Sequence, residues 1–421
     1  MDWTSATKVD RGQVLVNDRE QLIYLLTEAA EIEHGLMCSY LYAAWSLKQG
    51  REEGLTDAQR AAVDGWRTSI QSVAMEEMLH LALVNNLLIS LGSPPHFSRP
   101  NFPVAPGYHP SSIIARLTPF DRDTADHFVY LERPEGVDLP RARGFEGGAE
   151  YRRYTGPPRL TPTAEEYDTV GHLYRGVEDG LRALARSLGE RNLFLGDPRA
   201  QLDKDVLPLD GIIAVTGLDS ALAAVSTIIE QGEGGRRDAE KSHYLRFRTI
   251  RDEYDRLLAQ DPQFQPYRPA MSDPLMFRPL PGREGVQVTA RTAAMVLDLA
   301  NAAYGLMLRL LASGFGMYAG SRADRKTAIE SAIGLMSILK SLGILLTTLP
   351  AGEGDTRAGM NFHLPRSTLA LPQPHAARAV LAERAGEIAK ALAALGEEAG
   401  GGVEELARRL LRIAQDLRGG Q

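Results

Sequence analysis

The longest helical pattern in this chain is the feature that most constrains its fold. From about residue 56 to residue 91 apolar side chains recur at helical spacing, and the pattern stops at Gly92-Ser93-Pro94-Pro95, a sequence typical of a helix end. An amphipathic helix has to bury its apolar face against other elements. The segment therefore predicts a long helix inside a layer of packed helices.

Similar patterns predict helices along the rest of the chain. Four more lie in the first part, at about residues 17–49, 161–188, 219–231 and 242–258, and four lie in the last part, at 289–313, 324–349, 375–395 and 403–417. No repeat of solenoid length is visible. The predicted fold class is all-α.

Two irregular segments divide these helices. Residues 93–160 are rich in Pro, Gly and Arg and include a predicted strand at 128–132; a long irregular insertion of this kind is often a lid or a channel wall. A proline-rich linker at about 260–288 predicts a domain boundary. We therefore expect one domain at 1–275, with 93–160 as its insertion or lid, and a C-terminal helical domain at 276–421.

Acidic and histidine side chains fall on the apolar stripes of the first two helices. Glu33 shares its stripe with Leu26 and Tyr40, and Glu77 and His80 lie one turn apart on the stripe of the second helix. Glu76 falls one step aside, so we expect it outside the group that faces inward.

The next three helices continue this pattern. Glu178 shares a stripe with Tyr174, Glu230 and Glu233 extend the stripe of the fourth helix, and His243 begins the fifth. Each residue alone has an ordinary explanation, such as a pairing with Arg, a solvated turn or a hydrogen-bonded core histidine. Together they predict more, because several buried carboxylates would repel one another unless cations lay between them.

The residue types indicate which metal such a site would hold. Carboxylate and imidazole suit iron or manganese, and inward Glu and Glu-x-x-His pairs bind two such ions in helical bundles. The single cysteine, Cys38, excludes an internal disulfide and thiolate zinc sites. We expect two iron ions, with manganese as the alternative.

Composition limits the cellular locations and the classes of binding partner that we expect. The formal net charge is −7, and no strong basic run indicates nucleic acid. The N-terminus shows no secretory signal, and charged or polar residues interrupt the apolar stretches well short of a membrane span. The sequence therefore predicts a cytoplasmic protein that binds neither nucleic acid nor membrane.

Several motifs resemble those of ferritin-like proteins. Glu31-Ile32-Glu33-His34 with Tyr40-Leu41-Tyr42, and Glu76-Glu77-Met78-Leu79-His80, resemble the first two helices of such bundles. Glu230-Gln231-Gly232-Glu233-Gly234 and Ser242-His243-Tyr244 add a narrower similarity to the ferritin-like domain of iminophenylpyruvate dimer synthases of the violacein and rebeccamycin pathways. The resemblance covers about residues 15–275 and extends more weakly to the C-terminal helices.

The resemblance implies a ferritin-like four-helix bundle and a set of metal ligands. Carried over by position, the ligands are Glu33, Glu77, His80, Glu178, Glu230 and His243. The chain departs from plain ferritins in the fourth helix, where a Glu-x-x-His pair is replaced by Glu230 and Glu233. Glu233 is therefore the alternative to Glu230.

The expected function is that of a non-haem di-iron oxidase or oxygenase. Its partners would be O₂ and a small organic, amino-acid-derived substrate of a biosynthetic pathway, with a homo-oligomer or a pathway enzyme as a further partner. Tyr40 and Tyr174 lie on the stripes that face the site and are the candidate catalytic residues, although packing alone explains both. The alternatives are a ferroxidase or iron-handling protein and a non-catalytic scaffold subunit.

Overall fold

Helices dominate the part of the chain that the computed structural model describes, which comprises residues 14–110, 112–146, 153, 160–234, 241–279, 281, 284–316, 320–352, 354–364, 366, 373–399 and 402–419. The first part contains α1 (Arg19–Ser46), α2 (Asp57–Ser90), α3 (Arg122–Leu131), α4 (Val170–Leu188), α5 (Glu190–Leu193), α6 (Leu218–Ile229) and α7 (His243–Gln260). The second part contains α8 (Arg291–Gly314), α9 (Arg322–Leu346), α10 (Pro374–Leu395) and α11 (Val403–Arg418). The predicted all-α class is confirmed.

Shorter elements join these helices. A π-helical turn, Glu230–Gly234, extends α6, and 3-10 turns lie at Arg51–Glu53, Pro198–Ala200 and Gly396–Ala399. The strands β1 (Pro274–Leu275) and β2 (Val286–Gln287) pair in parallel within the predicted linker.

Polar side chains fix where the bundle helices begin. The Asp18 carboxylate accepts a hydrogen bond from the backbone N–H of Gln21 at the start of α1, and Thr56 forms a capping box with Gln59 at the start of α2. Thr169 and Ser242 cap α4 and α7 in the same way. Such caps satisfy amide groups that have no partner inside the helix.

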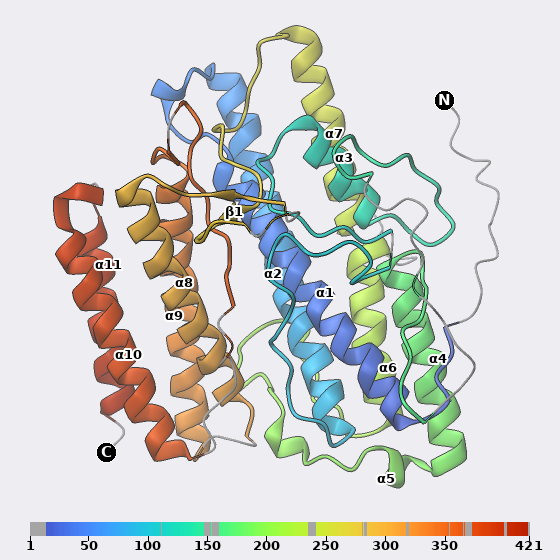
Figure 1. Ribbon diagram of the computed structural model, residues 1–421. Coiled ribbons are helices and arrows are strands. Elements are labelled where there is room, and N and C mark those ends of the chain that lie inside the picture. Colours follow the sequence, from blue (N-terminus) through green and yellow to red (C-terminus); the bar gives the residue numbers. More distant parts are fainter. Residues whose placement is uncertain are drawn as a thin grey trace.

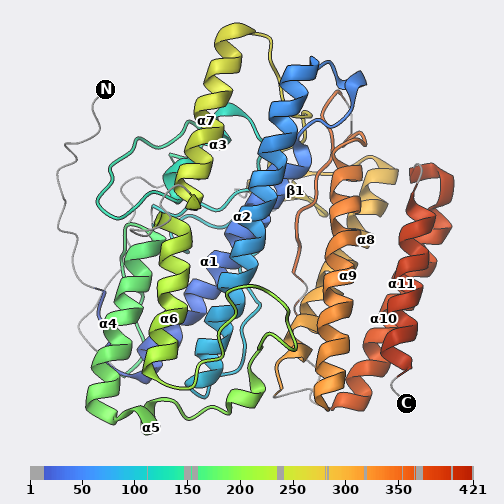
Figure 2. The same ribbon diagram turned by 180° about the vertical axis from the view of Figure 1, so that it is seen from behind.

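The helices are arranged in pairs, one beside the next. α4 and α6 pack on one side of the α1–α2 pair, α8 and α9 pack on its other side, and α10 and α11 cover α8 and α9 (Figures 1 and 2). Helix α3 lies against α7. The first helix pair is thus buried between the α4–α6 pair and the C-terminal helices.

Close packing joins the C-terminal helices to α1. The Trp45 ring stacks on Phe362 with 5.5 Å between ring centroids, and Gly343 of α9 leaves room for Trp45, because a Cβ there would lie 2.1 Å from the indole. One apolar core runs through both parts of the molecule. The domain division at residue 275 therefore stays a prediction.

Two segments of the expected secondary structure were wrong. Residues 128–132 do not form a strand, because Asp121 caps a helix that begins upstream and places Phe128 and its neighbours in its last turns. The third helix begins at Val170 rather than near 161, because Thr169 supplies the cap. Gln21 exchanges hydrogen bonds with the backbone N–H and C=O of Thr163, which holds that residue outside the helix.

Two C-terminal helices are apolar enough to cross a membrane by length and composition. They are α8 and α9, whose most apolar windows are 72% and 50% buried inside the protein. Core helices meet the same criterion, and these two pack against α1, α10 and α11. Their apolar character therefore has an explanation in the packing of the described chain.

Candidate metal centre

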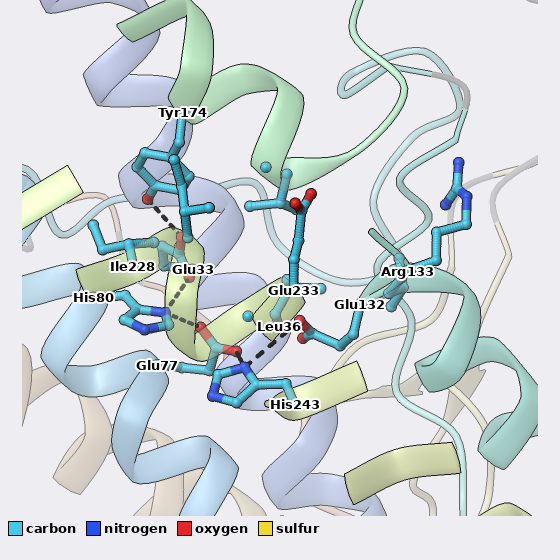
Figure 3. Close-up of a pocket in the computed structure, with 15 residues that line it drawn as sticks. Glu33, Leu36, Glu77, His80, Glu132, Arg133, Tyr174, Ile228, Glu233 and His243 are labelled. Atoms are coloured by element: carbon cyan, nitrogen blue, oxygen red, sulfur yellow. Dashed lines mark hydrogen bonds and ion pairs between the residues drawn. The ribbon is translucent and has the colours of Figure 1, made fainter. Parts of the chain in front are cut away.

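Three helices and the insertion bring acids and histidines to one buried point. Glu33 comes from α1, Glu77 and His80 from α2, His243 from the first residue of α7, and Glu132 from the residue that follows α3. The side chains of Glu33, Glu77, His80 and His243 are at most 2% exposed. Figure 3 shows them converging from separate helices.

These side chains form two groups that share Glu77. In the first group, His80 Nδ1 lies 3.0 Å from Glu77 Oε2 and 3.5 Å from Glu33 Oε2. In the second group, His243 Nδ1 lies 3.0 Å from Glu77 Oε1 and 3.6 Å from Glu132 Oε2. Each group has ligand atoms within 4.8 Å of one another. The two oxygens of Glu77 therefore face one histidine each.

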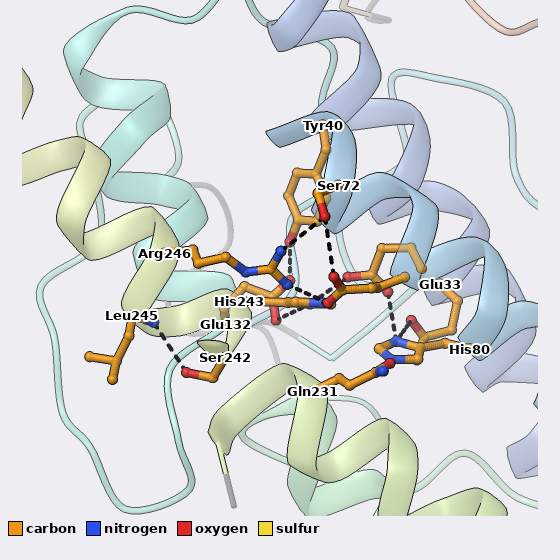
Figure 4. Close-up of polar contacts among 12 residues, drawn as sticks. Glu33, Tyr40, Ser72, His80, Glu132, Gln231, Ser242, His243, Leu245 and Arg246 are labelled. Atoms are coloured by element: carbon orange, nitrogen blue, oxygen red, sulfur yellow. Dashed lines mark hydrogen bonds and ion pairs between the residues drawn. The ribbon is translucent and has the colours of Figure 1, made fainter. Parts of the chain in front are cut away.

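The outer nitrogen of each histidine is held by a different partner. His80 Nε2 donates to Gln231 Oε1 at 2.9 Å, and His243 Nε2 donates to Glu76 Oε2 at 2.9 Å. Arg246 donates to the same Glu76 oxygen, and the Ser72 hydroxyl lies 3.4 Å from Glu76 Oε1 (Figure 4). Partners of this kind fix the ring orientation of metal-binding histidines, and both Nδ1 atoms are left facing the carboxylates.

Two buried tyrosines hold the outer oxygens of the remaining carboxylates. The Tyr174 hydroxyl donates to Glu33 Oε1 at 2.5 Å, and the Tyr40 hydroxyl donates to Glu132 Oε1. Burial and the neighbouring carboxylates raise the pKa of both tyrosines well above the usual value. Both phenols are therefore neutral donors that orient a carboxylate and leave its second oxygen facing a histidine.

The shared burial changes the pKa values of the group. Burial raises the pKa of Glu33, and the nearby Glu77 carboxylate raises it further, to about 8. Burial alone would lower the pKa of His80, but Glu77 and Glu33 raise it to about 10. His243 and His80 outweigh burial and hold the pKa of Glu77 well below its usual range. At neutral pH the metal-free group therefore carries protons that a bound cation would have to displace.

Two of the expected ligands lie elsewhere. Glu178 forms an ion pair with Arg182 on the outer side of α4, and Glu230 accepts a hydrogen bond from Ser226 on the exposed side of α6. The buried stripe of α4 contains Tyr174, Val177, Leu181 and Leu184, so Glu178 is one position off the inward face. The structure thus corrects the facing of both residues.

Glu233, the alternative to Glu230, lies at the edge of the site. It lines the same cavity as the two groups, but its carboxylate is held by Arg175 at 2.5 Å. Its Oε1 also accepts from the backbone N–H of Glu135 at 3.2 Å. In this structure it therefore faces α4 and the insertion rather than the histidines.

Glu132 is the residue that sequence reasoning missed. In the second group Glu132 stands where we expected an acid from the third or fourth predicted helix. It belongs instead to the insertion, in a segment that we expected to be a strand. Its position directly after the apolar run 128–131 was the available signal. Because residues 128–131 form the last turn of α3, the Glu132 side chain that follows them lies in the protein interior.

The cavity beside these groups, the metal-centre cavity, is small. Its volume is about 20 Å³, and its wall includes Leu36, Tyr174, Ile228, Gly232 and Glu233 (Figure 3). A buried water needs roughly 10–15 Å³ of such volume. The cavity therefore holds about one water-sized molecule.

Comparisons with protein families and with solved structures find ferritin-like matches. A family model described as Ferritin-like matches residues 26–252. A crystal structure of a ferritin-like protein from Caulobacter vibrioides covers 84% of this chain and 100% of its own, at 18% identity and a TM-score of 0.51. At this identity the likeness shows the fold alone.

Two curated relatives are longer proteins. Dichlorochromopyrrolate synthase of Lentzea aerocolonigenes is 27% identical over an alignment 416 positions long, which covers 89% of this chain and 39% of the synthase. The 2-imino-3-(indol-3-yl)propanoate dimerase of Chromobacterium violaceum is 28% identical over an alignment 373 positions long, which covers 83% of this chain and 34% of the dimerase. The chain therefore spans less than two fifths of the length of either relative.

Proposed function

This chain belongs to the ferritin-like family, and from that premise we propose that it is a di-metal, O₂-dependent oxidoreductase. Its metal ligands would be Glu33, Glu77 and His80 at one position and Glu77, Glu132 and His243 at the other. The observation that carries the proposal is the placement of the two oxygens of Glu77 between two histidines. Glu77 would thus supply one carboxylate oxygen to each of the two metal positions.

The donor set fits such a pair of ions. His243 Nδ1 is buried and makes no hydrogen bond, although carboxylate oxygens lie 3.0 and 3.6 Å away. A buried nitrogen left without a partner is costly unless something else occupies the point it faces. Oxygen and imidazole donors without thiolate suit iron, with manganese as the alternative. When bound, such ions supply the electrons for O₂ reduction.

The chain's own residues would position and enclose the site. Tyr40 and Tyr174 orient Glu132 and Glu33, Glu76 and Gln231 hold the histidine rings, and Leu36 and Ile228 exclude water. We assign the metal-binding unit to residues 1–275, with 93–160 as a wall that supplies Glu132. The C-terminal helices, 276–421, would support α1 from its other side.

The substrate class follows from the relatives. One relative is named as a dimerase of 2-imino-3-(indol-3-yl)propanoate and the other as a dichlorochromopyrrolate synthase, so we propose a small, amino-acid-derived aromatic acid for this chain. We do not extend the dimerisation or synthase reaction of the complete relatives to this chain, because it spans only part of their length. We also propose that the protein is soluble and acts in the cytoplasm.

A second candidate function is supported by the cavity. A volume of about 20 Å³ admits O₂ or water but no organic molecule. This observation favours a ferroxidase that oxidises iron without an organic substrate. The two candidates predict the same metal content and differ in what consumes O₂.

The test begins with protein purified without chelators. We expect about two iron or manganese ions per chain, and no metal above trace would overturn both candidates. The Fe(II)-loaded protein is then exposed to O₂ with and without 2-imino-3-(indol-3-yl)propanoate. O₂ consumption that continues with the imine supports the oxidoreductase. Consumption that depends only on added Fe(II), with many irons retained per chain, supports iron handling.

A further inference from the structure

A larger cleft lies on the outer side of the helices that enclose the metal centre. Arg175, Glu178 and Arg182 of α4 line it on one side, and Leu222, Ile229 and Glu230 line it on the side of α6. Its volume is about 490 Å³, within the range of roughly 300–1,000 Å³ that ligand pockets occupy. We refer to it as the α4/α6 cleft.

An ion pair and an apolar side chain lie between this cleft and the metal-centre cavity. Arg175 lines the cleft, Glu233 lines the cavity, and Ile229 lines both. Arg175 Nη2 lies 2.5 Å from Glu233 Oε2, and Arg175 Nη1 lies 2.7 Å from Glu135 Oε2. Beside Ile229, the two spaces therefore meet at the electrostatic contact between Arg175 and Glu233.

The position of Glu233 depends on a glycine. A Cβ at Gly171 would lie 1.8 Å from Glu233 Oε1, so only glycine at this point of α4 admits the carboxylate. Glu233 is carried by the π-helical turn Glu230–Gly234, in which Gly232 and Gly234 flank it. Glycine permits backbone rearrangement at low steric cost. The Glu233 carboxylate thus occupies the space that Gly171 leaves free. The glycine-containing turn that carries it can change its backbone conformation.

We propose that the α4/α6 cleft is an antechamber in which Arg175 binds the carboxylate of an aromatic acid, and that Glu233 then leaves Arg175 and opens the way to the metal-centre cavity. This inference rests on the proposed function, since it gives that site its substrate entry. It also accounts for a cavity too small for an organic substrate beside a cleft that is large enough.

The exchange on Arg175 replaces one carboxylate with another. The Arg175 side chain is 41% exposed and can meet a ligand in the cleft, whereas the Glu233 side chain is 9% exposed, so the pair is only half exposed and a carboxylate has to stay on the guanidinium during the exchange. An incoming carboxylate takes the place of the Glu233 carboxylate on Arg175 Nη2, so the guanidinium keeps a charge-assisted hydrogen bond there while Nη1 stays with Glu135. Leu222 and Ile229 provide apolar surface for the ring of the acid.

The first test measures binding to the metal-free protein by calorimetry. The probes are indole-3-propionate and its neutral analogue indole-3-propionamide. We expect the acid to bind and Arg175→Gln to weaken it about tenfold or more, as loss of a charged hydrogen bond does, with little change for the amide. Arg186→Gln, an exposed arginine on the same helix, is the matched control. Equal binding of the acid to wild type and Arg175→Gln would overturn the docking site.

The second test measures access to bound metal. The protein is loaded with Fe(II) without O₂, and the rate of iron removal by the neutral chelator 2,2′-bipyridine is followed by absorbance. Gly171→Ala expels Glu233 without changing any charge, and Glu233→Gln weakens its hold on Arg175. We expect both to accelerate removal several-fold, and indole-3-propionate to accelerate it in wild type but not in Arg175→Gln.

Gly65→Ala on α2 is the control for Gly171→Ala, because a Cβ at Gly65 meets no atom within 4 Å. Unchanged removal rates in both Gly171→Ala and Glu233→Gln would refute the gate. If the protein binds no metal at all, the proposed function fails, while the calorimetric test on metal-free protein still decides whether the cleft binds the acid.

Discussion

The first two helices and the first two C-terminal helices are both pairs of long helices, but they differ in what they bury. α1 and α2 carry Glu33, Glu77 and His80 in their interior, each at most 2% exposed. Among the described residues of the C-terminal region (291–316, 320–352, 354–364, 366, 373–399 and 402–418), no acidic or histidine side chain is buried. Its buried cation, Arg325, donates to the backbone carbonyls of Gly314 and Arg199.

This difference indicates that α1 and α2 bury groups that lower the stability of the fold in order to form the candidate metal centre. Charged groups are buried at a cost of several kcal/mol unless they are paired or bound to metal. In their described residues the C-terminal helices bury the charge of Arg325 against backbone carbonyls, whereas α1 and α2 concentrate several charged groups at one point, with partners from α7 and the insertion. A region whose buried charge is held by backbone carbonyls supports the fold, whereas the cluster of carboxylates and histidines carried by α1 and α2 is the candidate metal site.

The largest expected effect comes from removing the shared carboxylate. Glu77→Ala should lower metal content from about two ions to near zero, because both groups lose a ligand. Elemental analysis of the purified variant measures this. Glu330→Ala on α9, where the side chain is 62% exposed, is the control and should keep its metal. Retention of one ion by Glu77→Ala would show that Glu77 belongs to a single position.

A core truncation in the C-terminal region tests the other half of the comparison. Leu342 of α9 is fully buried, and Leu342→Ala should lower the free energy of unfolding by about 2–5 kcal/mol. Chemical denaturation of the metal-free protein measures the loss, and metal content should stay at the wild-type value. A parallel loss of metal would mean that the C-terminal helices determine the geometry of the site through α1.

The sequence predicted the helices better than the insertion. Periodicity and caps such as Thr56 and Ser242 are local signals, and the predicted helix limits lie within a few residues of the observed ones outside 161–169. In the insertion, the run 128–131 is apolar throughout, so it has neither a helical nor a strand period. Its identity depends on Asp121, several residues upstream, and the run therefore could not be assigned from its own residues.

The candidate site was partly visible in the sequence for a similar reason. Glu33, Glu77 and His80 lie in long helices where the apolar stripe is well defined, and the structure brings them together with His243. Glu178 lies beside a stripe that Val177 shares, so an error of one position turned it inward. Glu132 depends on how the insertion folds back onto α7, which is a tertiary contact that no local pattern contains.

A smaller effect should distinguish the two metal positions. Glu76 was expected to lie aside from the inward group, but it holds His243 Nε2 at 2.9 Å, whereas a neutral amide holds His80. Glu76→Gln should weaken the second position about 10–100-fold, as loss of an outer partner does, and leave the first unchanged. Metal titration by calorimetry separates the two steps. Equal weakening of both would show that Glu76 acts on the shared Glu77 instead.

The smallest expected effect concerns the two acids of the α4/α6 cleft. Glu178 pairs with Arg182 four residues away, and both side chains are at least 33% exposed. Such a pair is worth about 0.3–0.5 kcal/mol, so Glu178→Gln and Glu230→Gln should change the melting temperature little and the metal content not at all. Loss of an ion in either variant would mean that α4 or α6 turns inward when metal binds. Helices of the bundle beyond α1, α2 and α7 would then also bury charged groups. The difference in buried charge between the bundle and the C-terminal region would be larger.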